Sequence, residues 1–306
     1  MNDNVMTWSL ATVHLSASVD LALVDRYGLD AVSPATARWL RASVRQLVTF
    51  LGRDPAVEEL TPVQLQRWAQ ADVARGVSAV SSNSRLRAVK TLYSRLQRNG
   101  VIGTNPAEPV HYLPEPPARP RAVSRDDYMA MRQAARHARD RAILDVLWSS
   151  GCRLGGLLSM RIDRMERWVQ NGHECYALMV IEKFSRPRWV YVGRDPLEAE
   201  GLTEWLSERP LVGSPWLWLA FAPHHGLMAP PTVESVMRHL RLAAGINGRP
   251  CSAHAFRHAF AIRMLDEGVD PAAVSAWLGH HSPEFTMEMY VRRSERQLRE
   301  KYFARE

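Results

Sequence analysis

Apolar residues recur at the three- and four-residue spacing of an amphipathic helix through most of the first hundred positions. Two of these segments begin at Ser33-Pro34 and Thr61-Pro62, where a capping hydroxyl precedes a first-turn proline. Glycines at positions 52 and 76 then stop them. The pattern predicts helices over about 34–51, 62–75 and 81–98, and a weaker pattern allows a short helix within 10–23.

The helical pattern is interrupted by the segment LPEPPARPRAV at residues 113–123. Its four prolines and its lack of periodicity are typical of a stiff linker. A chain of 306 residues also suggests two domains, because single hydrophobic cores usually stop growing before this length. We therefore predict an N-terminal helical domain over residues 1–112, a linker over 113–123 and a second domain over 124–306.

The second domain combines helical segments with one stretch of strand-like alternation. Within residues 165–192, Asn171-Gly172 is a strong hairpin signal, and residues 176–181 and 188–192 have the composition of strands. Residues 216–221 form an apolar run that suits a buried strand or an extended segment. Helices are predicted over about 124–135, 141–150, 195–208 and 231–244. The predicted fold class is mainly α with a small antiparallel β-sheet.

Composition narrows the class of protein. The net charge of +7 favours a polyanionic partner without proving one. The three cysteines are scattered without a C-x-x-C pair, which argues against a disulfide framework or a zinc site. His224 and His225 lack a third ligand at a suitable spacing, so we expect loop histidines and no metal. No signal peptide opens the chain and no apolar run could span a bilayer, so we expect a cytoplasmic protein without a membrane partner.

Candidate chemistry gathers in residues 254–290, which read HAFRHAFAIRMLDEGVDPAAVSAWLGHHSPEFTMEMY. His254 and Arg257 are three residues apart, so they would share one face of a helix. Tyr290 lies two turns into a helix that Ser282-Pro283 would start. One short region thus carries a histidine, an arginine and a tyrosine as candidate catalytic residues on successive predicted elements.

A short helix and a tight turn are predicted in the middle of this region. Asp270 is a natural N-cap and Pro271 a natural first helical residue, while Gly279 stands where a left-handed C-terminal cap belongs. His280 follows at once, so it would leave a turn rather than the side of a helix. The predicted apolar face of the short helix consists of Val274, Trp277 and Leu278.

This region resembles the C-terminal box of the phage integrase family, the tyrosine recombinases. The family pattern is H-x-x-R, then L-G-H, then a tyrosine nine or ten residues on, and these places are filled here by His254-x-x-Arg257, Leu278-Gly279-His280 and Tyr290. Because several spacings agree at once, the match is specific. The competing interpretation is a helical domain with a core tyrosine and capping histidines.

Two further places of the family pattern lie upstream. Arg153, after Ser150-Gly151, matches the family's first arginine, although Gly156 stands where a carboxylate often follows to orient it. Lys183 matches a lysine in the turn of the family's small sheet. An independent argument supports Lys183, because lysine can give up a proton when its pKa is lowered, whereas arginine cannot, and this chain uses arginine almost everywhere.

The resemblance implies phosphoryl transfer, which is catalysed mainly by positioning and by neutralising charge on the phosphate oxygens. Arg153 and Arg257 would bind those oxygens, since planar guanidinium groups do so bidentately. His280 would hold another phosphate oxygen. The alternative role of Arg153 is that of a plain surface arginine.

The remaining three residues would move protons and form the covalent bond. Tyr290 would attack the scissile phosphate and form a 3′-phosphotyrosyl bond, with His254 as its general base and Lys183 protonating the departing 5′ oxygen. Religation to another 5′ hydroxyl would conserve the bond energy. The resemblance therefore implies no cofactor, no metal and no ATP.

The family also suggests how the chain would engage DNA. It implies an N-terminal core-binding domain, a tyrosine-recombinase catalytic domain of α+β type, and a homo-tetramer on double-stranded DNA with inverted-repeat core sites. The charged tail after Tyr290 would dock on a neighbouring protomer, and the protein would associate with the nucleoid. On the predicted helix 81–98, Arg85, Arg87 and Lys90 are candidate phosphate contacts, with a solvated basic face as the plain alternative.

Three functions remain open from the sequence. The first is a site-specific recombinase of the integrase or transposase type. The second is a type IB topoisomerase-like enzyme, which shares the arginine, lysine and tyrosine chemistry but acts as a monomer. The third is a non-catalytic DNA-binding relative, suggested by Gly156.

Overall fold

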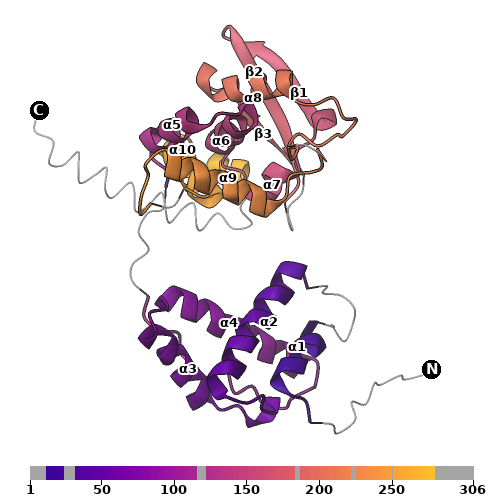
Figure 1. The fold of residues 1–306 in the computed structure, drawn as a ribbon, viewed down its shortest axis with the longest axis vertical. Coiled ribbons are helices and arrows are strands. Elements are labelled where there is room, and N and C mark those ends of the chain that lie inside the picture. Colours follow the sequence, from indigo (N-terminus) through magenta and orange to yellow (C-terminus); the bar gives the residue numbers. More distant parts are fainter. Residues whose placement is uncertain are drawn as a thin grey trace, which may run out of the picture. The chain divides into compact units, whose positions relative to one another are not determined.

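The computed structural model describes residues 12–23, 32–115, 122–182, 187–221, 225–249 and 251–279. The chain divides into two compact units, Met1–Ala118 and Arg119–Glu306 (Figure 1). Their border lies inside the proline-rich segment. The described elements of the first unit are helices, and those of the second are helices and a three-stranded antiparallel sheet. The predicted fold class is therefore confirmed, while the roles given to the two domains and the linker stay predictions.

The first unit is a group of helices around one hydrophobic core. Its elements are α1 (Leu15–Leu23), α2 (Pro34–Leu51), the 3₁₀ turn η1 (Val57–Glu59), α3 (Pro62–Ala74) and α4 (Ala79–Arg98). The predicted caps form: the Ser33 hydroxyl accepts from the backbone N–H of Thr36, and Thr61 makes a reciprocal capping box with Gln64. The largest fully buried side chains in this core are Leu15, Leu40, Leu47, Leu65, Trp68, Leu86, Leu92 and Tyr93.

The second unit places helices against a small sheet. Its helices are α5 (Arg125–Ala134), α6 (Ala138–Ser150), α7 (Leu154–Leu158), α8 (Pro196–Glu208), α9 (Pro230–Ala243), α10 (Ala253–Asp266) and α11 (Pro271–Leu278), with the 3₁₀ turn η2 at Ile162–Arg164. The strands β1 (Met165–Gln170), β2 (His173–Val180) and β3 (Arg188–Val192) pair antiparallel in that order.

The hairpin between β1 and β2 turns at Asn171 and Gly172, both with positive φ, as the Asn-Gly pair predicted. Strand β1 is mostly exposed, whereas β2 is largely buried because α8 packs on it, and α6 packs on β3. Residues 216–221 are an extended segment joined by isolated bridges at Trp216 and Leu219 rather than a strand. This segment still delivers apolar side chains to the core.

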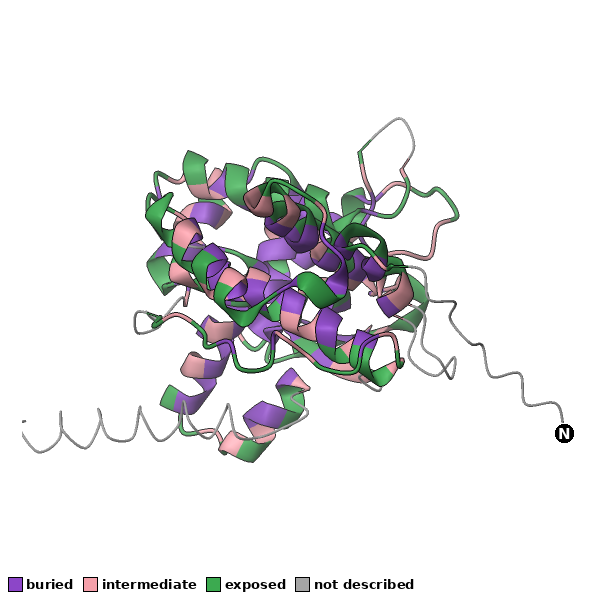
Figure 2. Cartoon of the chain, turned by 90° about the horizontal axis from the view of Figure 1, so that it is seen from below, coloured by how far each residue is buried: buried purple, intermediate pink, exposed green. Residues whose placement is uncertain are grey.

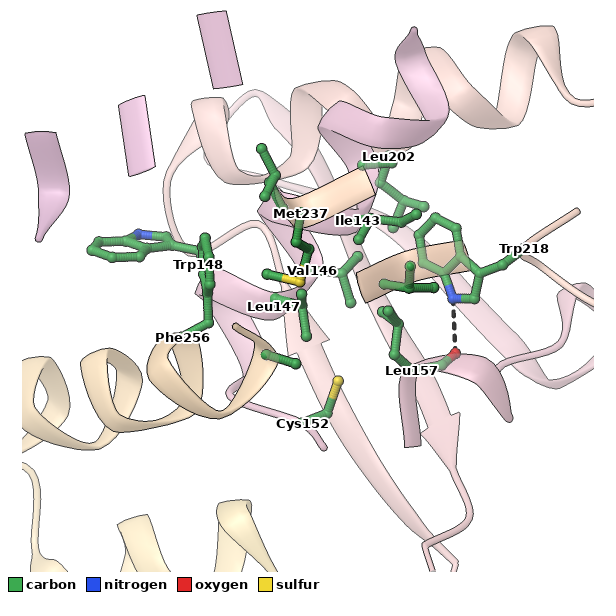
Figure 3. Packing of buried hydrophobic residues seen from close by; sticks show 14 of the residues in the cluster. Ile143, Val146, Leu147, Trp148, Cys152, Leu157, Leu202, Trp218, Met237 and Phe256 are labelled. Atoms are coloured by element: carbon green, nitrogen blue, oxygen red, sulfur yellow. Dashed lines mark hydrogen bonds between the residues drawn. The ribbon is translucent and has the colours of Figure 1, made fainter. Parts of the chain in front are cut away.

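The core of the second unit lies between α6, the sheet and the surrounding helices (Figure 3). The Trp218 indole N–H donates to the carbonyl oxygen of Leu157 at 2.8 Å, which ties the extended segment to α7. Helix α6 is buried along almost its whole length, whereas surrounding helices such as α9 also carry exposed residues (Figure 2). Side chains drawn in this core include Ile143, Val146, Leu147, Trp148, Leu202, Met237 and Phe256.

Helix α11 begins and ends where the sequence predicted. Asp270 accepts from the backbone N–H of Ala273, and Gly279 ends the helix at φ 64°. Val274 and Leu278 are fully buried, but Trp277 is 40% exposed, so its assignment to the apolar face was wrong. Two buried apolar positions suffice because, among the described helices, α11 packs mainly against α10.

Within the described residues, no helix is both long enough and apolar enough to cross a membrane. The three cysteines are buried and unpaired.

Helices α6 and α8 approach closely at Gly201. A Cβ placed there would lie 2.4 Å from the Asp145 Oδ2 and 3.0 Å from the backbone nitrogen of Ala142. The same carboxyl oxygen accepts from the Gly201 N–H at 3.1 Å. We predict that Gly201→Ala lowers the free energy of unfolding by about 1–3 kcal/mol, because overpacking forces buried groups apart.

The matched control is Gly155→Ala, since a Cβ at Gly155 meets nothing within 4 Å. Thermal unfolding of both variants checks the prediction. Equal midpoints for the two variants would contradict the close approach of α6 and α8.

Candidate active site

The structure describes three of the six residues predicted to act in catalysis. Arg153 lies between α6 and α7, and His254 and Arg257 lie in the first turns of α10. Lys183, His280 and Tyr290 lie outside the described residues, so their roles stay predictions. The contacts of Arg153, His254 and Arg257 lie within the second unit.

Gly151 lets the end of α6 pack against the middle of α10 and the end of α11, beside Arg153. It caps α6 in the left-handed region, with φ 58°, and a Cβ there would lie 2.9 Å from both Leu278 and Phe260. Glycine is therefore required twice, by the backbone angle and by the close approach. As a result, the backbone just before Arg153 packs directly on α10 and α11.

Arg153 is held by a buried carboxylate. Its backbone N–H donates to the Glu182 Oε1 at 2.9 Å, and its Nη1 forms an ion pair with the other carboxylate oxygen. The same nitrogen approaches the Gly279 carbonyl oxygen at 3.5 Å. The Arg153 side chain is 42% exposed whereas that of Glu182 is 2% exposed, so the guanidinium remains accessible from solvent while its anchor is not.

Arg257 joins the ends of two helices. Its Nη1 donates to the Gly151 carbonyl oxygen at 3.0 Å and its Nη2 to the Leu278 carbonyl oxygen at 2.8 Å. Burial, and then the nearby charge of Arg153, lowers the pKa of Arg257 to about 10. The guanidinium therefore still carries its charge near neutral pH.

A third arginine, Arg188 at the start of β3, completes the group. Its Nη2 donates to the Glu182 Oε1 at 3.0 Å and to the Leu278 carbonyl oxygen at 3.1 Å. Its Nη1 donates to the Trp277 carbonyl oxygen at 2.5 Å. Arg188 and Glu182 were missed by the sequence analysis, although Glu182 directly precedes the predicted Lys183.

Three guanidinium groups thus meet at the C-terminal end of α11 with a single carboxylate, which leaves a net charge of +2. The carbonyl oxygens at that end carry partial negative charge, which favours cations there. An excess of positive charge held by fixed hydrogen bonds suits a phosphate group. We call Arg153, Arg188, Arg257 and Glu182 the arginine cluster.

His254 is exposed and lies against His258. Their Nε2 atoms are 3.0 Å apart and their rings meet edge to face at 4.5 Å. In such a pair one ring donates a proton and the other accepts it, so at least one imidazole is neutral. His258 is therefore a hydrogen-bond partner of the predicted base.

The described residues contain no group of three or more histidine, cysteine or acidic side chains that could hold a metal ion.

The predicted DNA-contacting residues on α4 differ in their surroundings. Arg85 donates to the buried Asp72 at 2.7 Å. Lys90 donates to the backbone carbonyl oxygen of Val110 at 2.6 Å and lies over the Tyr112 ring. Arg87 is exposed, with its guanidinium carbon 5.5 Å from the centre of the same ring. Of the three, Arg87 is the one whose charge faces solvent.

Comparison with protein families gives two matches. Residues 122–297 match the phage integrase family, and residues 29–100 match its N-terminal SAM-like domain. Among curated relatives, tyrosine recombinase XerC of Xanthomonas campestris is 27% identical over 292 residues, covering 92% of this chain and 87% of the relative. XerC of Alcanivorax borkumensis is 26% identical over 257 residues, covering 81% and 80%.

Solved structures share the fold. A lambda integrase dimer bound to a COC′ core site has a TM-score of 0.69 at 18% identity, over 91% of this chain and 77% of that one. XerH site-specific recombinase in a post-cleavage complex with palindromic difH substrate has a TM-score of 0.69 at 16% identity, over 97% and 91%. A lambda integrase tetramer bound to a Holliday junction has a TM-score of 0.67 at 16% identity, over 92% and 78%.

Arg257 offers a test of the geometry that needs no DNA. We predict that Arg257→Ala lowers the free energy of unfolding by about 2 kcal/mol, because the buried Gly151 carbonyl oxygen loses the donor that Arg257 provides. Arg164→Ala, which removes an exposed arginine from η2, is the control. Thermal unfolding measures both, and equal midpoints would show that Arg257 does not join α6 to α11.

Proposed function

Because the chain belongs to the phage integrase family, the tyrosine recombinases, and is a site-specific DNA recombinase, we propose that it cuts and rejoins DNA strands through a covalent 3′-phosphotyrosyl bond to Tyr290. The observation that carries this proposal is the arginine cluster. It holds positive charge at the end of α11, immediately before the segment that contains His280 and Tyr290.

The scissile phosphate would bind at the arginine cluster. Arg153 supplies the solvent-accessible guanidinium, and Arg257 supplies a second charge fixed by two carbonyl oxygens. Both would stabilise negative charge that grows on the non-bridging oxygens during attack. Since these groups are already oriented, little reorganisation would accompany the reaction. His280, one residue beyond Gly279, would add a further contact to the phosphate.

The chemistry then requires one nucleophile, one base and one acid. The Tyr290 oxygen attacks phosphorus and its proton passes to His254, which lies against His258. The bond from phosphorus to the 5′ oxygen breaks, and that oxygen takes a proton from Lys183. Attack by another 5′ hydroxyl reverses the sequence and restores Tyr290. No step consumes ATP, and none needs a metal ion.

The substrate would be double-stranded DNA with inverted-repeat core sites, joined by a homo-tetramer in the cytoplasm. The DNA-bound forms of lambda integrase and XerH, which share this fold, support the DNA partner. The N-terminal unit would bind the duplex through the exposed face of α4. The tail after Tyr290 would dock on a neighbouring protomer.

A suicide duplex with a nick near the cleavage site tests the covalent step. We predict that the wild-type chain forms a protein–DNA adduct resistant to denaturation, and that Tyr290→Phe forms none while binding the duplex equally well. A chelating agent should leave adduct formation unchanged. If the wild-type chain binds duplex but forms no adduct, the catalytic proposal fails and a binding-only relative remains.

The same preparation separates a recombinase from a topoisomerase-like enzyme. Two duplexes that carry core sites should give recombinant products and synaptic complexes in a gel assay. Relaxation of supercoiled DNA without recombinants would instead favour the topoisomerase interpretation.

Arg87 tests the DNA contact of α4. We predict that Arg87→Glu weakens duplex binding several-fold and reduces the slope of log affinity against log salt by about one, because one phosphate contact is lost. Lys90 is a poorer choice, since its substitution also removes donors to Glu108 and Val110. Arg38→Glu, an exposed arginine on α2, makes the same charge change elsewhere. If Arg87→Glu and Arg38→Glu weaken duplex binding equally, the proposed DNA contact at Arg87 of α4 is refuted.

A further inference from the structure

Gly156 leaves space for a carboxylate that arrives from another element. A Cβ at Gly156 would lie 2.8 Å from the Oε1 of Glu182 and 3.0 Å from its Cγ. Because glycine has no Cβ, the Glu182 carboxylate can lie against α7 at this position without being pushed away. At the preceding Gly155 a Cβ would meet nothing within 4 Å. Adjacent glycines in the same short helix thus face entirely different surroundings.

The Glu182 carboxylate holds two arginines at once. One oxygen accepts from the Arg153 backbone N–H at 2.9 Å and from the Arg188 Nη2 at 3.0 Å, while the other pairs with the Arg153 Nη1. The side chain is 2% exposed, so water does not compete for these contacts. A buried carboxylate with three donors fixes the direction of both guanidinium groups.

Arg188 connects the Glu182 carboxylate to the C-terminal end of α11. It donates to the carbonyl oxygens of Trp277 and Leu278, and a Cβ at Gly279 would lie 2.6 Å from its Nε. Gly279 thus allows Arg188 to pack directly against the turn. The line of contacts runs from Glu182 at the end of β2, through Arg188 at the start of β3, to the last residues of α11.

Electrostatics explains why such an anchor is needed. Arg153 lies close enough to Arg257 for its charge to lower the pKa of Arg257, so the guanidinium groups repel one another. Without a central anion, the accessible Arg153 would swing toward solvent. With Glu182 present, the arginines stay together and the cluster keeps a net positive charge for a phosphate.

We propose that Glu182 is a positioning residue for strand cleavage, which orients Arg153 directly and the C-terminal end of α11 through Arg188. It supplies from the end of β2 the carboxylate that Gly156 lacks on α7. This inference rests on the proposed function, since the geometry that it fixes is that of the phosphate site. Glu182 itself does not touch the DNA.

The first experiment separates positioning from stability. Glu182→Gln keeps the size of the side chain but replaces one acceptor oxygen by a donor that faces the Arg153 Nη1. We expect single-turnover cleavage of the suicide duplex at saturating protein to fall about 10- to 100-fold, because small misplacements of charge near the reacting atoms have effects of that size. Duplex affinity should change less than about threefold, since the buried Glu182 side chain would not itself touch the DNA.

Thermal unfolding of Glu182→Gln shows whether the chain is folded under the assay conditions. Slow cleavage by folded, DNA-bound protein supports the proposal. Cleavage at the wild-type rate overturns it, and so does a loss that follows only the unfolded fraction.

The two glycines provide a matched pair that leaves Glu182 in place. Gly156→Ala pushes against the carboxylate and should slow cleavage, whereas Gly155→Ala should cleave like the wild-type chain. Both substitutions change helix propensity in the same direction. Equal cleavage rates for the two variants would count against the proposal.

Placing a carboxylate on α7 tests whether it can replace Glu182 in positioning Arg153. Glu182→Ala removes the anchor, and the added substitution Gly156→Asp projects a new carboxylate toward the space that Glu182 left. We expect the double variant to cleave at least about tenfold faster than Glu182→Ala alone. A double variant no faster than Glu182→Ala would show that a carboxylate at this place is not what the cleavage step needs.

A fourth measurement separates this inference from the proposed function. A thermodynamic cycle of Arg153→Ala and Glu182→Gln, followed by thermal unfolding without DNA, reports their coupling whether or not the chain cleaves DNA. If the wild-type chain forms no adduct but the cycle shows coupling, the proposed function fails while the anchor remains. If the adduct forms and the cycle shows no coupling, the anchor fails and the function remains.

Discussion

The packing at the centre of the second unit requires three positively charged arginines to lie close together. Arg153, Arg188 and Arg257 come from separate elements and meet at the last carbonyl oxygens of α11. Their mutual repulsion is offset by the Glu182 carboxylate and by the partial negative charge of the helix end. A buried charge without such partners would cost several kcal/mol. The arrangement of α6, α10, α11 and the sheet is consequently constrained by the hydrogen bonds of these arginines as well as by apolar packing.

Three glycines make this arrangement sterically possible. Gly151 lets the end of α6 touch Phe260 and Leu278, Gly156 admits the Glu182 carboxylate, and Gly279 admits Arg188. Each is needed for a different neighbour, and two of them also occupy the left-handed region. Positive charge is therefore concentrated where side chains pack directly against glycines. The site is held by main-chain carbonyl oxygens, which accept from Arg257, and by the Glu182 carboxylate, which holds Arg153 and Arg188.

Local patterns in the sequence predicted most elements but not their contacts. Helix starts at Pro34, Pro62 and Pro271 follow from caps and prolines, which act over a few residues and so can be recognised locally. Glu182 and Arg188 could not be found this way, because their partners Arg153 and Leu278 lie 29 and 90 positions away. Gly156 was noticed because it has no carboxylate, whereas its role depends on Glu182, which follows β2. Trp277 was misplaced because helical spacing does not tell how wide the covering surface is.

The basic face of α4 illustrates the same limit on inference from pattern. An amphipathic sequence shows which side of a helix is polar, yet Arg85 uses its charge to satisfy the buried Asp72 and Lys90 donates to main-chain carbonyls. In the second unit, by contrast, Arg188 and Arg257 donate to main-chain carbonyl oxygens, and the cluster still keeps an excess of positive charge. Arg257 is held at both amino groups and Arg153 remains 42% exposed, so the cluster divides two tasks between them. If the scissile phosphate binds here as proposed, the fixed charge of Arg257 would lower the free energy of the bound phosphate without reorganising, while the exposed Arg153 would meet the phosphate from solvent. Phosphate binding would then relieve the repulsion among the positive charges of the free protein, and that relief would contribute to the binding free energy.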